Sequence, residues 1–242
     1  MNDRIKLSVN INKIATLRNA RGGSVPDVLE AAKRIEQFGA DGITVHPRPD
    51  ERHITRNDVY GLKQIVATEF NIEGYPSDDF MAMVLEVKPH QVTLVPDPPE
   101  AITSNAGWDI EGNKGFLKDV VGKLKSEGIR VSIFLDAIPE RVLQAAAIGT
   151  DRIELYTESY AVGYTVNREL AIRPFVETAR EAQKHGLGLN AGHDLSFSNL
   201  RYFAEQVPGL LEVSIGHALI SDALYWGLEN TVSLYKRELQ IV

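Results

Sequence analysis

Eight short apolar runs rich in β-branched residues alternate with segments of helical pattern along the chain. Runs of this kind predict strands, and they lie at residues 5–11, 42–46, 70–75, 91–96, 130–136, 152–157, 187–192 and 212–217. The helices predicted between them include residues 26–39, 78–88, 114–128, 139–149, 173–186 and 218–239. Eight strand-then-helix repeats in 242 residues have the size and order of an α/β protein of the (β/α)8 TIM barrel class. We expect one barrel domain over residues 1–242, and a doubly wound open sheet is the main alternative.

Charge and composition exclude several classes of partner. The formal net charge is -7 and no run of lysine and arginine occurs, which disfavours a nucleic-acid partner. The chain has no cysteine, so it has neither a disulfide framework nor a cysteine-based metal site. Its beginning has no signal-peptide pattern, and no apolar run reaches the roughly 18 residues that a membrane span needs. We expect a soluble cytoplasmic protein without a membrane partner.

Polar residues gather at the carboxyl ends of the predicted strands, the end of a barrel where active sites lie. They are Asn10, Asn12, His46, Glu73, Asp136, Glu154, Thr157, Asn190, His193, Gly216 and His217. His90 and His185 lie at helix-to-strand turns on the opposite face, where we expect structural roles. A single polar strand end is usually a capping or solvated group. The coincidence of so many on one face predicts an active site there.

The segment after His46 indicates an anionic substrate. Arg48 and His53 follow it as cationic donors, although a charged solvated loop is the alternative reading. Gly216 and His217 open the last helix, whose free backbone N–H groups can hold a phosphate. Further donors near the same mouth are Arg21, Arg52, Thr103, Ser104 and Asn105. Two separate anion sites are therefore expected.

Several kinds of chemistry are disfavoured by the residues at the strand ends. The possible metal ligands are His46, Glu73, Asp136, Glu154 and His193, and the His-x-His pair of amidohydrolase barrels is absent. Lys13 follows the first strand but lies outside it, so no strand supplies a lysine for an enzyme-bound imine. No glycine-rich dinucleotide or ATP signature occurs. General acid and base chemistry on a phosphorylated small molecule remains.

The chain resembles the pyridoxine 5'-phosphate synthase family over nearly its whole length. The resemblance is carried, in order, by NINKIATLRNARGG, GADGITVHPRPDERHI, NIEGYP, QVTLVPD, IELYTE, LNAGHDLS and SIGHALISDAL. It implies a barrel with extra helices, a homo-octamer built as a tetramer of dimers, and no metal or organic cofactor. The implied reaction condenses 3-amino-2-oxopropyl phosphate with 1-deoxy-D-xylulose 5-phosphate to pyridoxine 5'-phosphate, phosphate and water.

The resemblance also implies a role for each site residue. His46 and Glu73 would accept protons, His193 would donate one and Glu154 would stabilise a transition state. The residues implied to bind the aminoketone phosphate are Asn10, Arg21, Gly216 and His217, and those implied to bind the deoxyxylulose phosphate are Arg48, His53 and Thr103.

The sequence departs from the family pattern at three positions. Asn12 and Lys13 stand where many members have an Asp-His pair that contacts deoxyxylulose phosphate. Asp194 stands where many members have glycine; a substrate contact through its backbone N–H would survive, while its carboxylate would have to turn away from a phosphate. We interpret these changes as variation that leaves the reaction intact.

Two other functions stay open at the level of sequence. Another phosphosugar enzyme of this fold, such as an isomerase, would need one acid and one base but no second anion site. A non-catalytic binding protein would have no need for His46, Glu73 and His193 at one point. The segment from Asp97 to Gly112, rich in proline, glycine and small polar residues, is the predicted lid.

Overall fold

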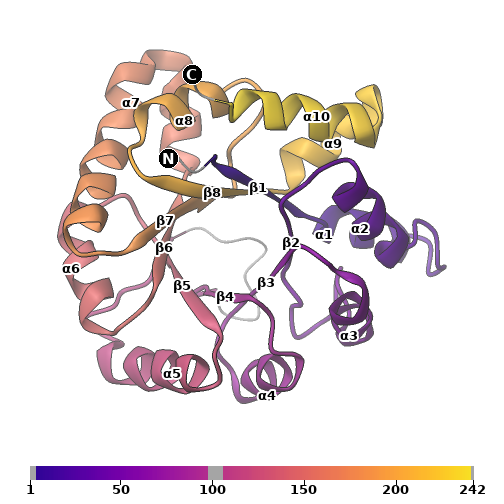
Figure 1. The fold of residues 1–242 in the computed structure, drawn as a ribbon, viewed down its shortest axis with the longest axis horizontal. Coiled ribbons are helices and arrows are strands. Elements are labelled where there is room, and N and C mark those ends of the chain that lie inside the picture. Colours follow the sequence, from indigo (N-terminus) through magenta and orange to yellow (C-terminus); the bar gives the residue numbers. More distant parts are fainter. Residues whose placement is uncertain (1–3, 98–105, 241–242) are drawn as a thin grey trace.

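The computed structural model describes residues 4–97 and 106–240 and contains a closed barrel of eight parallel strands (Figure 1). Each strand pairs with the next one along the chain, and the last pairs with the first. The strands are β1 (Lys6–Asn10), β2 (Gly42–Val45), β3 (Glu69–Gly74), β4 (Gln91–Leu94), β5 (Arg130–Leu135), β6 (Arg152–Tyr156), β7 (Gly188–Gly192) and β8 (Leu210–Ile215). The predicted (β/α)8 TIM barrel is confirmed, and the open sheet is wrong.

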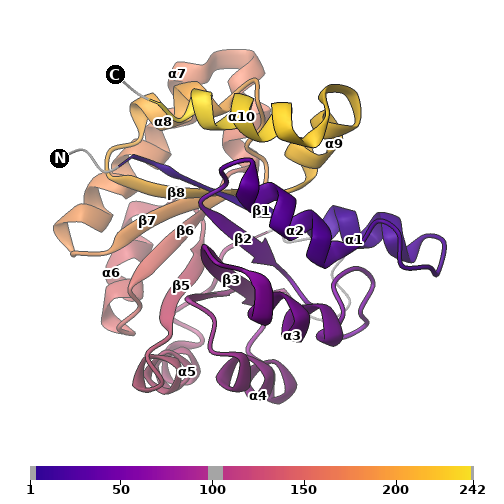
Figure 2. The same cartoon turned by 45° about the vertical axis from the view of Figure 1, so that its right-hand side comes forward.

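The helices form an outer ring around the strands (Figures 1 and 2). They are α1 (Asn12–Asn19), α2 (Val28–Gln37), α3 (Arg56–Ile65), α4 (Asp78–Val87), α5 (Lys114–Ser126), α6 (Pro139–Ala147), α7 (Glu158–Lys184), α8 (Leu200–Gln206), α9 (His217–Trp226) and α10 (Leu228–Glu238). Side chains before several helices accept hydrogen bonds from first-turn N–H groups, such as Asp27 from Glu30 and Ser77 from Phe80.

Two of the predicted helices differ in extent from the observed ones. The single helix predicted over residues 218–239 is wrong, because Gly227 adopts a φ of 78° and separates α9 from α10. Glycine adopts this backbone conformation without the steric cost that other residues meet. The helix predicted over residues 173–186 is only the second part of α7, which is interrupted at Asn167 by non-helical backbone angles.

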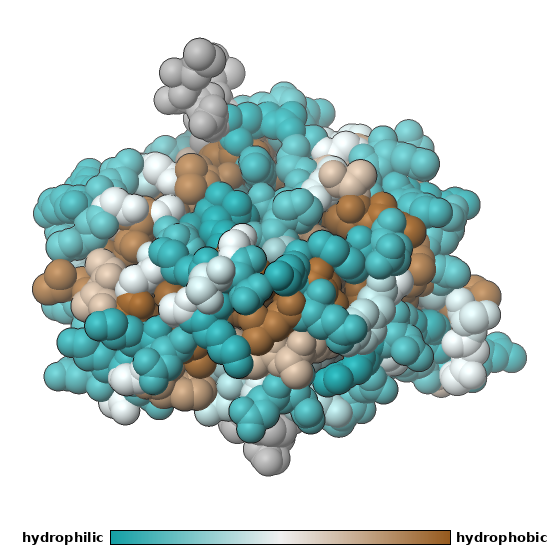
Figure 3. Space-filling model, turned by 60° about the horizontal axis from the view of Figure 1, so that its bottom comes forward, coloured by the Kyte–Doolittle hydropathy of each residue, from teal (hydrophilic) through white to brown (hydrophobic). Residues whose placement is uncertain are grey.

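The outward sides of the strands are apolar and buried beneath the helices. Successive strand residues point to opposite sides, and residues such as Leu7, Val9, Ile153 and Leu155 are fully buried in the continuous hydrophobic core. The surface on the side drawn in Figure 3 is mostly hydrophilic, with hydrophobic areas between the polar side chains. None of the helices in the described ranges is both long and apolar enough to cross a membrane.

The inside of the barrel is polar, although branched apolar residues usually fill this space. The hydroxyl oxygens of Ser8 and Thr44 lie 2.7 Å apart, the Asn71 amide donates to Thr44 over 3.3 Å, and the Thr93 hydroxyl donates to Asn71 over 3.1 Å. These bonds join β1, β2, β3 and β4 across their inner faces. Hydrogen bonding therefore compensates the burial of polar groups in the centre of the fold.

A network of charges fills the amino-terminal end of the barrel. Arg152 reaches Glu212 at 3.4 Å and Glu69 at 4.0 Å, so it links β6 to β8 and β3 across the interior. Arg130 forms a second ion pair with Glu69. Burial and the neighbouring Glu69 raise the pKa of Glu212 to about 8, against the opposing effect of Arg152. Arg152 therefore offsets only part of the cost of burying the Glu212 carboxyl group.

Replacing Arg152 with methionine should lower the free energy of unfolding by about 1–3 kcal/mol, because Glu212 and Asn190 would lose a buried charged donor while Glu69 keeps Arg130. Urea denaturation at pH 7 measures this change. Arg34→Met is the matched control, since Arg34 pairs with Glu30 on the exposed face of α2 and its loss should cost less than about 1 kcal/mol. Equal effects of the two substitutions would contradict a role of the network in stability.

Candidate active site

The four predicted acid and base groups lie together at the carboxyl end of the barrel. His46 directly follows β2 and His193 directly follows β7, whereas Glu73 and Glu154 belong to β3 and β6. The charges of Glu154 and His193 act on each other, as do those of His193 and His46 and those of Glu73 and Glu154. Asn10 at the end of β1 donates to Glu73 over 3.4 Å. The structure therefore brings these four residues and Asn10 to one mouth, whereas Asn190, also predicted there, accepts from Arg152 over 3.2 Å in the charge network at the amino-terminal end.

Both carboxyl groups of this cluster hold protons more tightly than exposed glutamates do. Burial, followed by the charges of Glu154 and Asp97, raises the pKa of Glu73 well above its usual value. Burial raises the pKa of Glu154 to about 7, against the opposing effects of the Thr93 hydroxyl and His193. Glu154 can therefore take up and return protons near neutral pH, and the pKa of Glu73 is shifted in the same direction.

The two histidines on the β2 side of the mouth favour the neutral form. Burial, followed by the charge of Arg48, lowers the pKa of His46 well below its usual value. The backbone N–H of His46 donates to the Asn12 side chain over 2.9 Å. The same causes lower the pKa of His53 to about 4, and its ring lies 6.4 Å from that of His46. A neutral imidazole is able to accept a proton.

His193 has the opposite electrostatic character. Burial lowers its pKa, but a hydrogen bond and the charge of Asp194, followed by the charges of Asp97 and Glu154, outweigh burial and raise the pKa. The Nδ1 atom of His193 lies 2.8 Å from a carboxylate oxygen of Asp194. The ring of Tyr156 meets the His193 ring edge-on at 5.5 Å between centroids. The mouth therefore holds histidines suited to both directions of proton transfer.

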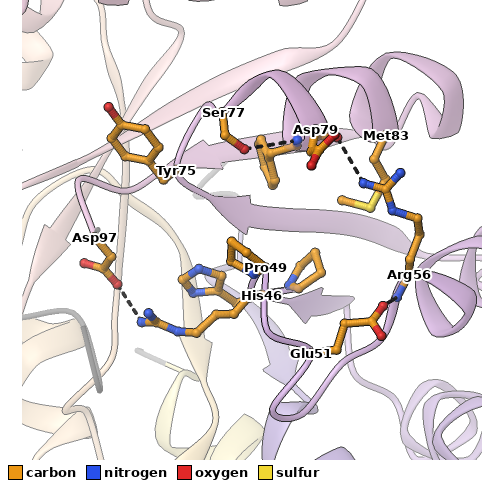
Figure 4. A pocket seen from close by; sticks show the side chains of 12 residues that line it. His46, Pro49, Glu51, Arg56, Tyr75, Ser77, Asp79, Met83 and Asp97 are labelled. Atoms are coloured by element: carbon orange, nitrogen blue, oxygen red, sulfur yellow. Dashed lines mark hydrogen bonds and ion pairs between the residues drawn. The ribbon is translucent and has the colours of Figure 1, made fainter. Parts of the chain in front are cut away.

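A pocket of about 170 Å³ opens beside His46, between the loop after β2 and the beginnings of α3 and α4 (Figure 4). Arg48 and Asp97 lie on its wall and form an ion pair of 2.8 Å, with both side chains almost completely buried. Figure 4 shows Asp97 on the same side of the pocket as His46 and Tyr75, with Glu51 and Arg56 opposite. Arg48 is thus held in place at the edge of the mouth.

Arg18 in α1 holds the loop after β2 and also forms a partly buried ion pair with Asp58 in α3. Arg18 in α1 contacts both carboxylate oxygens of Asp58 at 2.5 and 2.8 Å and donates to the carbonyl of His53 over 3.1 Å. The Asn19 amide donates to the same carbonyl over 2.8 Å. Asp58 also forms a capping box with Thr55 at the start of α3. These contacts fix the segment that carries His53.

The predicted residues on the β8 side lie around the start of α9. Gly216 precedes α9 and packs so closely on Asn10 that an added Cβ atom would come 3.0 Å from the Asn10 Cβ. His217 is the first residue of α9 and is exposed, as is Arg21 beyond the end of α1. Thr103, Ser104 and Asn105 lie outside the described residues, so their predicted binding roles stay predictions.

Other sequence predictions have mixed outcomes. His90 lies before β4, on the face opposite the mouth as expected, and its Nδ1 accepts from the backbone N–H of Phe70. Of the predicted lid, residues 98–105 lie outside the described ranges, whereas Trp108 is buried and donates to the carbonyl of Leu94 over 3.0 Å. The second part of the predicted lid is therefore anchored to the barrel. No group of three or more His, Cys, Asp or Glu side chains in the described part of the chain could hold a metal ion.

Sequence reasoning missed three features of the site. Asp97 was not predicted to pair with Arg48, nor was Tyr156 predicted to contact His193. The polar interior below the mouth was also missed. Polar residues at every second position indicate a polar interior, and this pattern occurs in the strand sequences RIELY and LLEVSI.

A closed parallel barrel with acid and base groups at its carboxyl-end mouth defines an enzyme of the (β/α)8 class. Residues 7–241 match the family model described as pyridoxal phosphate biosynthesis protein PdxJ. The chain is 63% identical to the pyridoxine 5'-phosphate synthase of Bacteroides thetaiotaomicron, over 97% of this chain and 99% of that protein. It is 58% identical to that of Porphyromonas gingivalis, over 98% of this chain and 99% of that protein. The chain belongs to the PdxJ family.

Solved structures of lower identity share the fold. A tryptophan synthase structure from Mycobacterium tuberculosis matches 99% of this chain and 94% of its own, with a TM-score of 0.66 and 13% identity. A thiamine phosphate pyrophosphorylase from Pyrococcus furiosus matches 98% of this chain and 96% of its own, with a TM-score of 0.63 and 13% identity. At this identity the likeness supports the barrel alone.

Replacing Arg18 with methionine should loosen the loop after β2, because Asp58 would lose its cation and the His53 carbonyl would keep only the Asn19 amide as donor. Amide hydrogen exchange in residues 51–55 should become at least about tenfold faster. Arg21→Met is the control, since Arg21 is exposed in the segment after α1 and should leave this exchange unchanged. Native exchange rates in the Arg18 variant would argue against the fastening contacts.

His53 should destabilise the protein at acidic pH. The unfolded chain binds a proton at His53 near its usual pKa of 6.5, whereas the folded chain binds it only near 4. Stability from this group is therefore complete above pH 6.5 and is lost as pH falls towards 4, by roughly 3 kcal/mol in all. Urea unfolding between pH 7 and pH 4.5 should show a shallower decline for His53→Gln than for native protein. The variant His185→Gln, at an exposed position after α7, should show the native decline.

Proposed function

We propose that this chain condenses 3-amino-2-oxopropyl phosphate with 1-deoxy-D-xylulose 5-phosphate to form pyridoxine 5'-phosphate, phosphate and water. The observation that carries the proposal is the set of acid and base groups at one mouth with opposite pKa shifts, in His46 and His193. A condensation with dehydration, phosphate loss and ring closure needs repeated proton transfers in both directions. The names of the 58–63% identical relatives support the same activity.

The proposed catalytic roles follow from these environments. His46, neutral through burial, accepts a proton, and the raised pKa of Glu73 makes its carboxylate a stronger base than an exposed glutamate. His193, with its raised pKa, donates a proton. Glu154, buried across the barrel from β3, stabilises a transition state. The imine forms between the two substrates, so no catalytic lysine is required.

Two sets of residues would hold the two phosphorylated substrates. We assign the aminoketone phosphate to Asn10, Gly216 and His217 around the start of α9, and to Arg21 in the segment after α1. We assign the deoxyxylulose phosphate to Arg48, His53 and Thr103. Asp194 was predicted to bind substrate through its backbone N–H, but this N–H donates to the Gly192 carbonyl and the Thr157 hydroxyl, at 3.0 and 3.1 Å. The proposal requires neither a metal nor an organic cofactor.

We also propose that the chain forms one barrel domain over residues 1–242, assembles as a homo-octamer built from dimers and acts in the cytoplasm. Large apolar side chains on the surface support self-association. Val162 and Val166 in the first part of α7 are 67% and 86% exposed, and Leu224 and Tyr225 in α9 are 75% and 86% exposed. The net charge of -7 agrees with the absence of a nucleic-acid partner.

Purified protein should form pyridoxine 5'-phosphate and release phosphate only when both substrates are supplied together, with or without a chelator. His193→Ala should lower kcat by about 10²–10⁴-fold, because it removes a general acid. His185→Ala, at an exposed position, is the matched control and should keep native kcat. Turnover of a single phosphosugar would instead identify an isomerase, and binding of both substrates without product would identify a non-catalytic binding protein.

A further inference from the structure

The side chain of Asp194 turns towards its neighbour in the chain, His193. His193 adopts a positive φ of 65°, an uncommon conformation for a residue with a side chain. The Asp194 carboxylate lies 2.8 Å from Nδ1 of the imidazole. The backbone N–H of Asp194 donates to Gly192 and Thr157, and its carbonyl accepts from Asn199 over 3.4 Å. The backbone of Asp194 is thus fixed by its own contacts, and the carboxylate is left to hold the ring.

This contact determines which nitrogen of His193 exchanges a proton. A carboxylate at Nδ1 accepts the Nδ1–H, so the ring keeps a proton on that atom in both its neutral and charged forms. The proton that His193 transfers is then the one on Nε2. In enzymes with a histidine–carboxylate pair, the carboxylate orients the imidazole and stabilises the imidazolium without taking its proton.

We propose that Asp194 is a positioning residue that fixes the tautomer of His193 and favours its protonated, proton-donating form. This inference rests on the proposed function only for the role of His193 as a proton donor. It assigns a role to the Asp194 side chain, whereas the substrate-binding role predicted from the sequence concerned only its backbone N–H.

The charged and titratable groups that face His193 from other elements agree with this role. Within residues 4–97 and 106–240 they include Tyr156 and Glu154 on β6, Asp97 after β4 and His46 after β2. Asp194, Asp97 and Glu154 favour the imidazolium, and together they outweigh the effect of burial, so the pKa of His193 is raised. Asp194 also forms a hydrogen bond with the ring.

The proton balance is simple. His193 starts as an imidazolium with protons on Nδ1 and Nε2, and the Nε2 proton passes to a departing substrate oxygen. The ring then becomes neutral, with Nδ1–H still donated to the Asp194 carboxylate. A later proton from water or substrate returns to Nε2. The pairing also reduces the repulsion expected between the Asp194 carboxylate and a substrate phosphate, because the imidazolium balances the negative charge of Asp194.

Two measurements test the pairing on the full-length protein. Deuterium exchange at the imidazole C2–H, followed by mass spectrometry across pH, reports the titration of His193 and needs no substrate. Asp194→Asn should shift that titration to lower pH. In the condensation assay the alkaline decline of kcat should move to lower pH as well, with a loss of about tenfold at pH 8 and a smaller loss at pH 6.

Glu158→Gln is the matched control. Glu158 accepts from the Tyr156 hydroxyl over 3.0 Å, so it lies near His193 through the same tyrosine but does not contact the imidazole in the described hydrogen bonds. It should leave the His193 titration unchanged. Asp194→Ser is a second carboxylate-free variant that should behave as Asp194→Asn does, and Asp194→Glu should restore part of the native pH profile.

The outcomes separate this inference from the proposed function. A native His193 titration in a folded Asp194→Asn or Asp194→Ser protein overturns the inference, as does an equal shift in Glu158→Gln. A shifted titration in the Asp194 variants alone supports the pairing, even if native protein forms no product from the two substrates. That second result would overturn the proposed function and leave the histidine–carboxylate pair in place.

Discussion

Closure of the parallel barrel is the constraint on which the rest of the structure depends. Because β8 pairs with β1, the carboxyl ends of all eight strands meet at one mouth. Residues as distant in sequence as Asn10 and Glu73 come within hydrogen-bonding distance there. Closure also creates an interior that solvent does not fill freely. Burial in that interior shifts the pKa values of the groups that point into it. Closure of the barrel therefore determines both the position of the site residues and how tightly they hold protons.

The polar interior connects stability with chemistry. Apolar side chains hold the outside of the strands to the helices, while hydrogen bonds and ion pairs fill the inside. Glu154 belongs to both systems, since Thr93 donates to it within the barrel and its pKa is raised to about 7 at the mouth. Replacing Glu154 would therefore alter the catalytic group and also remove a hydrogen-bond acceptor from the network inside the barrel.

The sequence allowed the barrel, its strands and the strand-end cluster to be predicted, because alternation and period are local properties of the chain. The break at Gly227 could not be separated from a tolerated glycine within a helix, since the two differ only in backbone angle. The pairs Arg48–Asp97 and Arg18–Asp58 depend on contacts 49 and 40 residues apart. The Asp194 carboxylate was identified in the sequence as a departure, but only side-chain direction shows that it turns to His193.

The fastening of α1 to the loop after β2 has a consequence for how kinetic data are interpreted. Under the proposed assignment, Asn10 and Arg21 lie at the two ends of the α1 segment and serve one substrate, while His53 serves the other. Arg18 and Asn19 join these two segments through the His53 carbonyl. The two substrate sites thus share one mechanical support. Under this assignment we expect a substitution of Arg18 or Asn19 to change the Michaelis constants of both substrates together, so neither change would identify which substrate the altered residue touches.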